Sequence, residues 1–472
     1  MSSNKMNYDT SIVIFTRDLR VNDNYMLHDA LKCSKNILPI FVFTPAQIDN
    51  NKRFNDNCFQ FMFESLKELN KKIPLHFFHD DLLTVVTRLK KHNQKIDAVF
   101  ISGDYTPFAK KRERDLQLLC KKLGMLINIV KNNHTLLDFN SLKNSTGETY
   151  KMFTPFFIKA YETIKSQTKN IFPITVSASI IKNKCVTTKQ QSSIKLSEME
   201  DYFEYNDDIA QHGGRSNAIQ LLKKLNPICK RYEKTKKMPS VNTTQLSAHN
   251  KFGTVSIREV YFVFITYKNK AISLLEQLFW REFYYYLLEN NQKSLTQNFN
   301  KKWNKFPWQF NRYYYERWKM GRTGFPMVDA AMRELNATGY IHNRSRMIAA
   351  MFLTKNLNIS WKYGDYYFSK KLTDYDPAQN AGNWQWVAGS GVDPLRYGMP
   401  RVMDPWRQQK KQDPECIYVK KWIPELKNIP NKSIKNWNTD HHNFPNVYIK
   451  PMIDYDSTIE RFKKRFRHMT KY

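Results

Sequence analysis

The sequence predicts an α/β domain with a doubly wound parallel sheet, followed by an all-helical domain. Short β-rich runs alternate with segments of helical length through the first third of the chain, an order that is typical of a parallel sheet. After residue 208 strand signals become rare, and apolar residues recur at three- and four-residue spacing. Polar, irregular sequence from about residue 165 to residue 208 separates the two parts and is expected to be a surface connector.

Five runs are expected to be the strands of the sheet: SIVIFT, ILPIFVFT, PLHFF, DAVFIS and LINIV. Intervening segments such as NDNCFQFMFESLKELNKK and AKKRERDLQLLCKKLG are expected to be helices. Sheets of this kind bind ligands beyond the carboxyl ends of their strands. The first run is followed by RDLRVNDN, which lacks the G-x-G-x-x-G pattern, so a standard dinucleotide site is not indicated there.

The second part of the chain is expected to be helical throughout. Its helical segments include GRSNAIQLLKKLNPICKRY, AISLLEQLFWREFYYYLLE, PMVDAAMRELNATG and IHNRSRMIAAMFLTKNL. We therefore expect an α/β domain over residues 1–130, an interdomain connector over residues 131–209 and a helical domain over residues 210–472.

The chain is strongly basic, with 75 Lys and Arg against 43 Asp and Glu and a formal net charge of +32. Such a charge favours a polyanionic partner such as nucleic acid, although a general basic bias of the proteome would also explain it. The six Cys are far apart and form no CxxC pair, so neither a disulfide framework nor a metal site is indicated. No signal peptide and no membrane-spanning run is recognised, so an intracellular, soluble protein is expected.

The segment AISLLEQLFWREFYYYLLE places an acid and an indole on one helix face. Glu276 and Trp280 are four residues apart, and residues at this spacing are neighbours on a helix surface. The two side chains can therefore face one space. The ordinary alternative is that Trp280 fills the core and Glu276 pairs with a Lys.

The stretch DYDPAQNAGNWQWVAGSG, residues 374–391, is expected to be a loop because it contains Pro, Asn and Gly. Asp374 is a candidate partner for Arg346, because an unpaired buried charge is costly. Asp376 is then left to accept hydrogen bonds from a ligand. The alternative is a buried turn in which Trp384 and Trp386 only fill core space.

A row of small hydroxyl groups lies upstream, in VNTTQLSAHNKFGTVS. Thr243, Thr244 and Ser247 with their backbone N–H groups can hold a phosphate where such a segment opens a helix. Ser and Thr also simply cap helices, so this segment alone is weak support for a phosphate site.

Three ordered motifs carry a resemblance to a known family. The patterns ELxWREFY, TGxPxVDAAMRELxxTGxxHNRxRM and DxDxxxNxGxWQW, found within residues 276–284, 323–347 and 374–386, look like those of the photolyase and cryptochrome family. The opening FTRDLRVNDN and the closing DPECIYVKKWIPEL are also similar to that family, so the match covers nearly the whole chain. The resemblance implies an antenna-type α/β domain and a helical domain that binds FAD and DNA.

The resemblance also implies a site for FAD, whose reduced form is active. It places Arg346 against Asp374 beside the flavin and Asn380 opposite flavin N5, where a neutral amide accepts or donates hydrogen bonds in either redox state. The residues implied to hold the cofactor are Tyr232, Thr243, Thr244, Gln245, Leu246, Ser247, Asn343, Arg346, Asp374, Tyr375, Asp376 and Asn380.

Relatives repair UV-damaged DNA with light, by passing an electron from reduced FAD to a flipped-out pyrimidine dimer. Trp280 and Trp386 match the aromatic walls of the dimer pocket, and Glu276 matches the acid that stabilises charge on the dimer. The residues implied to bind substrate or DNA are Lys236, Glu276, Trp280, Arg281, Asn343, Arg344, Met347, Trp386, Arg401 and Gln408. Trp308, Trp361 and Trp384 match a chain of electron donors that refills an oxidised flavin.

Within the family the sequence favours repair of cyclobutane dimers by a class I enzyme. Six-four enzymes carry two histidines around HNRSRM, where this chain has only His342. Signalling relatives often replace the amide at Asn380 and extend the C-terminus, but a cryptochrome stays the alternative. Asn383, Tyr340 and Thr16 depart from the usual residues, which leaves redox tuning open.

The second chromophore is the least determined feature. Folate-using relatives have a glutamate that aligns near Phe108, so folate is not expected, and a deazaflavin, a second flavin or no antenna remain open. The protein is expected to be a monomer.

Overall fold

The structure is a computed structural model that describes residues 8–166, 173–187, 193–267, 271–392 and 398–471. The chain forms two compact units. Unit 1 contains residues 1–205, 211–230 and 244–292, and unit 2 contains residues 206–210, 231–243 and 293–472. The domain boundaries expected at residues 130 and 209 stay a prediction. None of the helices in the described ranges combines the length and apolar character that a membrane crossing requires.

The five expected strands are present in unit 1 and form one parallel sheet, which confirms the predicted fold class. They are β1 (Tyr8–Phe15), β2 (Ser34–Phe43), β3 (His76–His79), β4 (Ile96–Ser102) and β5 (Leu126–Val130), in the order β3-β2-β1-β4-β5. The intervening helices are α1 (Tyr25–Cys33), α2 (Asp56–Asn70), α3 (Leu82–His92) and α4 (Pro107–Lys122). The chain adds β2 and β3 on one side of β1 and then β4 and β5 on the other side, so the sheet is doubly wound.

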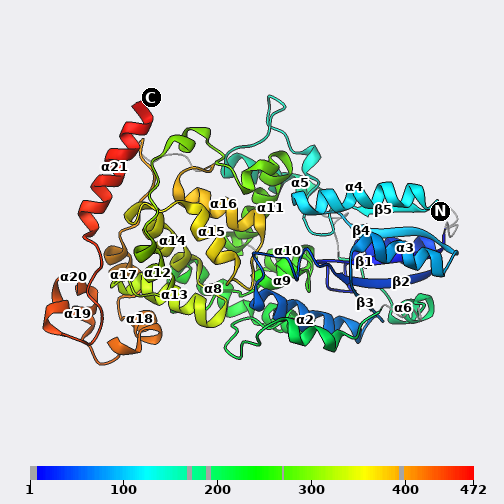
Figure 1. Cartoon of the computed structure of the whole chain (residues 1–472), viewed down its shortest axis with the longest axis horizontal. Helices are drawn as coiled ribbons and strands as arrows, with labels where there is room; N and C mark the ends of the chain where they lie inside the picture. Colours follow the sequence, from blue (N-terminus) through cyan, green and yellow to red (C-terminus); the bar gives the residue numbers. More distant parts are fainter. Residues whose placement is uncertain (1–7, 167–172, 188–192, 268–270, 393–397, 472) are drawn as a thin grey trace. The chain divides into compact units, whose positions relative to one another are not determined.

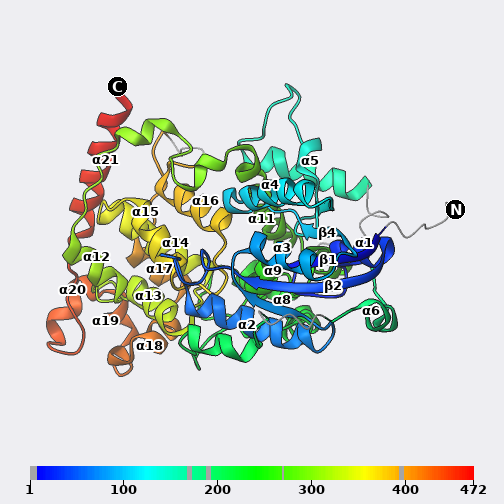
Figure 2. The same ribbon diagram turned by 45° about the vertical axis from the view of Figure 1, so that its right-hand side comes forward.

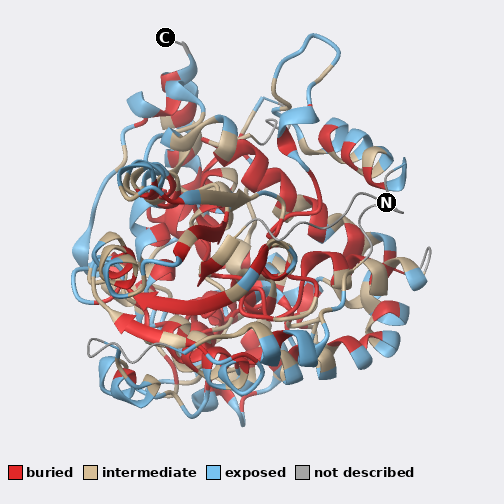
Figure 3. Ribbon diagram, turned by 90° about the vertical axis from the view of Figure 1, so that its right-hand side faces the viewer, coloured by how far each residue is buried: buried red, intermediate tan, exposed pale blue. Residues whose placement is uncertain are grey.

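Both faces of the sheet are buried, as doubly wound sheets require. Side chains alternate along β1, so Val13 and Phe15 pack with α1 and α2, whereas Ile12 and Ile14 pack with α3 and α4. Figures 1 and 2 show α2 and α4 on opposite sides of the strands, and Figure 3 shows the strands as largely buried.

The connector is more ordered than its polar sequence predicted. It contains α6 (Ala178–Lys184) and a 3-10 helix at Leu196–Tyr202, and it forms single parallel and antiparallel bridges to β2 and β3. Its Ile181 and Met199 are buried against the sheet. The segment covers the edge that the short β3 leaves open, which is a common way to protect an edge strand. Residues 167–172 and 188–192 of the expected connector lie outside the described residues.

The other elements in the described ranges are helices, as expected for residues 210–472, and α5 (Phe153–Ser166) lies within the expected connector. Unit 1 also contains α5, α7 (Arg215–Lys223), α9 (Ser247–Phe252), α10 (Ile257–Thr266) and α11 (Ile272–Asn290), and α8 (Leu225–Thr235) runs from unit 1 into unit 2. In unit 2 are α12 (Arg312–Lys319), α13 (Pro326–Thr338), α14 (Asn343–Met351), α15 (Trp361–Ser369), α16 (Pro377–Ala388), α17 (Pro405–Gln412), α18 (Ile417–Trp422), α19 (Asn431–Lys435), α20 (Trp437–Asp440) and α21 (Tyr455–Lys471).

Two expected helices are interrupted in the structure. The segment at residues 214–232 divides into α7 and α8, because Pro227 lacks an N–H group and is accommodated only in the first turn of a new helix. The segment at residues 341–357 passes from α14 into a π-helical turn at Phe352–Asn356.

The expectation of a loop at residues 374–391 is wrong, because most of this stretch is the helix α16. The carboxylate of Asp376 caps the helix by accepting from the N–H groups of Ala378 and Gln379, and Pro377 occupies the first turn. Gly389, in the left-handed conformation at φ 85°, ends it. The residues that suggested a loop are therefore the start and stop signals of a helix.

Candidate active site

An ion pair joins α14 to the turn that precedes α16. Arg346 donates from Nη2 to Asp374 Oδ2 at 2.8 Å and from Nε to the carbonyl oxygen of Ile341 at 2.9 Å. Burial opposes the charge on Arg346, but the carboxylate of Asp374 raises the pKa of the guanidinium above its ordinary value. The pair that the sequence suggested is confirmed, and its geometry is that of a strong, charge-assisted contact.

The same carboxylate retains an open acceptor. The Oδ1 atom of Asp374 is buried and has no hydrogen-bond partner among the residues that the structure describes. A buried acceptor without a donor is costly unless a ligand or water supplies one. The site therefore fits a ligand with an N–H or O–H group at this position.

His342 begins α14 as a neutral cap. Its Nδ1 atom accepts from the backbone N–H of Arg344 at 3.1 Å, so the proton of the neutral ring lies on Nε2. Burial, together with the charges of Arg344 and Arg346, lowers the pKa of His342 to about 4. The ring is therefore uncharged near neutral pH.

Asn380, on α16, is held in one orientation by its neighbour. Its Nδ2 atom donates to both the backbone oxygen and Oδ1 of Asp365 on α15, at 3.0 and 2.7 Å. Two acceptors on that side fix which amide atom is nitrogen. The Oδ1 atom of Asn380 is thereby set as a hydrogen-bond acceptor, although the sequence allowed either role.

The two tryptophans of α16 lie in different environments. Because they are two residues apart, they point to opposite sides of the helix, and Trp384 is buried while Trp386 is half-buried. The ring of Trp384 lies on Gly364 of α15, where an added Cβ would stand 2.1 Å from the indole. Only glycine permits this approach of ring and helix.

The other two members of the expected tryptophan chain are close to α15. Trp361 begins that helix, is buried, and donates from Nε1 to Asn298 Oδ1 at 2.8 Å. Two hydrogen bonds tie the segment that carries the half-buried Trp308 to Asn358. The backbone N–H of Gln309 donates to the backbone oxygen of Asn358, and the side-chain Nδ2 of Asn358 donates to the backbone oxygen of Pro307. Trp384 thus lies against the first turn of α15, Trp361 is the first residue of that helix, and the Trp308 segment contacts the turn before it.

The expected phosphate-binding segment, residues 243–247, has an unusual backbone. Gln245 has φ 53°, a conformation that a non-glycine residue adopts at some cost, and its carbonyl accepts from Gln211 Nε2 at 2.7 Å. Ser247 is exposed and starts α9. Within unit 2, the hydroxyl groups of Thr243 and Tyr340 are 3.4 Å apart, so the tyrosine that departs from the family pattern contacts this segment.

Trp280, on α11 of unit 1, stands against another aromatic ring. Phe153 of α5 stacks on it with centroids 3.7 Å apart and planes inclined by 7°. One face of Trp280 is therefore backed by protein. Arg281, which is expected to bind DNA, donates to the buried Glu282 and to the carbonyl oxygen of Asn250, and its expected role stays a prediction.

The acid of this helix does not stand where the quoted pattern places it. In ELxWREFY the acid precedes the tryptophan by three residues, whereas Glu276 precedes Trp280 by four, and Gln277 occupies the third position. Both spacings put the side chain beside Trp280 on the helix surface. Glu276 is half-buried and Gln277 is exposed. The role expected for Glu276 stays a prediction.

Several expected substrate residues lie in unit 2. The guanidinium of Arg401 lies over the ring of Trp386, 5.2 Å from its centroid. Asn343 Nδ2 is 4.0 Å from Met347 Sδ, and Arg344 Nη1 is 3.7 Å from the sulfur of Met403. Gln408 lies on α17, and its buried Oε1 has no partner in the described part of the chain.

The remaining expected residues have local partners. Lys236 follows α8 and pairs with Glu233, with Tyr232 one turn earlier on the same helix. Tyr375 donates its backbone N–H to Leu372, and Leu246 and Thr244 precede α9. Because α11 belongs to unit 1 and α16 to unit 2, the structure describes the two sets of expected residues separately.

Sequence reasoning missed Gly364 and Asp365, which hold Trp384 and Asn380. The only signal was a glycine inside a helical run, WKYGDYYFSK, which costs helix stability and so indicates a packing reason. Phe153 gave no signal, because its contact with Trp280 joins segments far apart in the sequence.

Family models match both parts of the chain. Residues 11–173 match the model described as DNA photolyase, and residues 274–468 match the FAD binding domain of DNA photolyase. The deoxyribodipyrimidine photo-lyase of Buchnera aphidicola subsp. Acyrthosiphon pisum is 33% identical over 478 residues, which cover 95% of each chain.

Solved structures agree with these matches. An archaeal photolyase from Sulfolobus tokodaii, solved with two FAD molecules, superposes with a TM-score of 0.84 at 32% identity, over 97% of this chain and 100% of that one. A Synechocystis cryptochrome gives a TM-score of 0.85 at 25% identity, over 97% and 99%. The chain belongs to the photolyase and cryptochrome family, as its motifs indicated, and its C-terminal part is an FAD-binding domain.

A buried acid behind the Arg346 pair makes the stability of the protein depend on pH. Burial raises the pKa of Glu334 to about 7, and the hydroxyl of Tyr418 donates to its Oε2 at 2.6 Å. Unfolded Glu334 ionises near 4.5, so between the two values the folded state retains a proton that the unfolded chain has lost. The contribution of Glu334 to stability therefore falls as pH rises through this range.

We predict that Glu334→Gln weakens the fall of the unfolding free energy between about pH 5 and 7. Urea unfolding at several pH values measures this slope. Glu316→Gln, which removes a half-exposed carboxylate of α12, is the matched control and should retain the parent slope. An unchanged slope in Glu334→Gln would contradict the assignment.

Proposed function

We propose that this chain repairs cyclobutane pyrimidine dimers in DNA with light, as a class I photolyase. The observation that carries the proposal is the group of Asp374, Arg346 and Asn380. It offers one open carboxylate oxygen, one paired guanidinium and one amide oxygen of fixed orientation, next to the two tryptophans of α16. This donor and acceptor set suits a flavin ring, which presents both N–H groups and acceptor atoms.

Asp374, Arg346 and Asn380 of unit 2 would contact the flavin of FAD and set its surroundings. Asp374 Oδ1 would accept from the cofactor, Arg346 would hold that carboxylate ionised, and Asn380 would offer its oxygen near flavin N5. Thr243 to Ser247 would bind the phosphates. When bound and reduced, FAD supplies the photoexcited electron that splits the dimer and takes it back afterwards.

The dimer would leave the DNA stack and contact aromatic side chains. Trp280, backed by Phe153, and Trp386, covered by Arg401, are the residues expected to contact its bases. Asn343 and Met347 are expected to bind the substrate as well. Lys236, Arg344, Arg401 and Gln408 would contact phosphates or flanking groups, and the charge of +32 would draw the protein to DNA. The protein would act as a monomer wherever the DNA of the cell lies.

Trp308, Trp361 and Trp384 would restore the reduced state of the cofactor. Their attachment to α15 and the turn before it supports a path from the buried Trp384 to the half-buried Trp308. An oxidised Trp308 can release its indole proton to water, which stops the electron from returning.

A cryptochrome-type signalling role is the second candidate, because a cryptochrome also superposes over nearly the whole chain. Fold alone does not decide between them. The neutral amide of Asn380 favours repair in our interpretation.

We predict that the purified, reduced protein restores oligonucleotides that contain a cyclobutane dimer under blue light and not in the dark. Six-four substrates, illuminated side by side, should remain damaged. Chromatography of the oligonucleotides measures both reactions. Unchanged dimer content after illumination would favour signalling, and repair in the dark would exclude the photochemical mechanism.

The position of the acid on α11 can be tested separately. Glu276→Gln should lower the quantum yield of dimer repair, by up to about a hundredfold for a lost general acid–base group, because the carboxyl group can no longer donate a proton or a strong hydrogen bond. The matched control is Gln277→Ala, one residue further along the helix, which should retain the parent yield. A loss in Gln277→Ala with a normal yield in Glu276→Gln would move the role to Gln277.

A further inference from the structure

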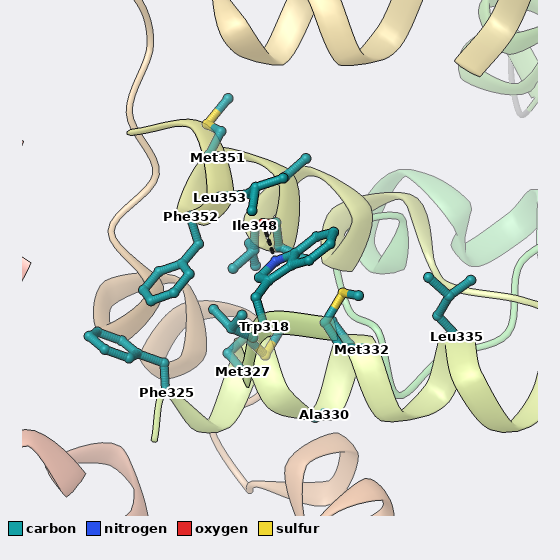
Figure 4. Packing of buried hydrophobic residues seen from close by; sticks show 14 of the residues in the cluster. Trp318, Phe325, Met327, Ala330, Met332, Leu335, Ile348, Met351, Phe352 and Leu353 are labelled. Carbon is teal, nitrogen blue, oxygen red and sulfur yellow. Dashed lines mark hydrogen bonds between the residues drawn. The ribbon is translucent and has the colours of Figure 1, made fainter. Parts of the chain in front are cut away.

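Trp318 is a fully buried tryptophan that none of the family motifs assigns to the site. It lies on α12, and its Nε1 donates to the carbonyl oxygen of Ala349 at 3.0 Å. Figure 4 shows this hydrogen bond and the apolar side chains of α13 and α14 around the indole, among them Met332 and Ile348. A structural role in the core is the ordinary interpretation of such a residue.

Its contacts connect it to the expected electron donor of the flavin. The rings of Trp318 and Trp384 meet edge to face, with centroids 6.2 Å apart. Phe368 lies against both, 4.9 Å from Trp384 and 6.1 Å from Trp318 by centroids. Two indoles in direct contact exchange an electron readily, because electron tunnelling weakens steeply with distance.

An aromatic column continues from Trp318 to the surface. Tyr315 stacks on Trp318 with centroids 6.0 Å apart, and Tyr363 lies 5.7 Å from Tyr315 and is 41% exposed. Tyr367 meets Trp318 from another side at 5.8 Å. By distance alone, an electron could move inward along these rings to an oxidised Trp318.

The chemistry of Tyr315 and Tyr367 opposes the loss of an electron from either ring. A phenol loses an electron easily only when a base takes its proton, and the hydroxyl of Tyr315 donates to the backbone oxygen of Tyr363, which is no base. The hydroxyl of Tyr367 donates to the amide oxygen of Asn336 at 2.6 Å. Burial raises the pKa of both, that of Tyr367 to about 12.

An ion pair lies beside both phenol rings. The ammonium group of Lys319 lies 5.2 Å from the ring centroid of Tyr315 and 5.7 Å from that of Tyr367. Glu316 Oε2 pairs with this ammonium group at 2.7 Å, so the two charges largely offset each other at the rings. Electron loss at both tyrosines is unfavourable because neither hydroxyl group has a base to take its proton.

From these contacts we infer that Trp318 is a second electron donor to Trp384, on a branch that is closed at its outer end. The inference rests on the proposed role of Trp384. Oxidised Trp384 takes one electron from Trp318 and becomes neutral, and Trp318 becomes a radical cation. Trp318 keeps its indole proton, because the oxygen of Ala349 accepts a hydrogen bond but not a proton. The electron therefore returns from Trp384 to Trp318, and Trp384 is oxidised again. Trp361 and then Trp308 supply the electron that finally reduces Trp384.

The test uses variants that cut the main path. In FAD-loaded Trp361→Phe, a light flash should still produce a tryptophan radical cation that decays without forming a neutral radical. In Trp318→Phe/Trp361→Phe this longer-lived signal should be lost. Transient absorption distinguishes the two radical forms and is independent of repair. Identical traces from the single and double variants would overturn the inference.

Three further variants keep the outcome interpretable. In Trp384→Phe neither the radical cation nor the neutral radical of tryptophan should form. If either forms, the proposed role of Trp384 fails, whatever the role of Trp318. Tyr315→Phe in the Trp361→Phe background should leave the signal unchanged, whereas a tyrosyl radical that depends on Tyr315 would show that the branch is open. If Trp318→Phe does not fold, Trp318→Tyr keeps the aromatic volume, places a phenol with no base nearby, and should give the same loss.

Discussion

The ion pair between Arg346 and Asp374 is the contact on which the site in unit 2 depends. It fixes the end of α14 that carries Asn343 and Met347 against the turn before α16. The pair is partly buried, so removing one partner leaves a poorly solvated charge without compensation, which is destabilising. The pair also leaves one oxygen of Asp374 open, so a single contact both holds two helices in place and presents an acceptor to a ligand.

From that turn, local rules of helix formation place the remaining groups. Asp376 starts α16, Gly389 ends it, and the helical period then sends Trp384 and Trp386 to opposite sides. Gly364 lets Trp384 approach α15, and Asp365, the next residue, orients Asn380. Adjacent residues of one helix thus position both the expected electron donor and the amide expected near the flavin.

The sequence predicted those parts of the molecule whose signals are local or belong to a family pattern. The five strands were found because a buried parallel strand is a short apolar run, and the Arg346 to Asp374 pair followed from the need to compensate a buried charge. The helix α16 was mistaken for a loop, because Pro and Gly signal helix ends as well as turns. Asp365 and Phe153 act through contacts between distant segments, which no periodicity reveals.

We propose the Asp374 carboxylate, held by Arg346, as a binding group of the FAD site. Equilibrium dialysis of FAD against the parent protein and Asp374→Asn measures it directly, with circular dichroism to confirm that the variant is folded. We expect the folded variant to bind FAD at least about tenfold more weakly. An equal dissociation constant for a folded Asp374→Asn protein would contradict it.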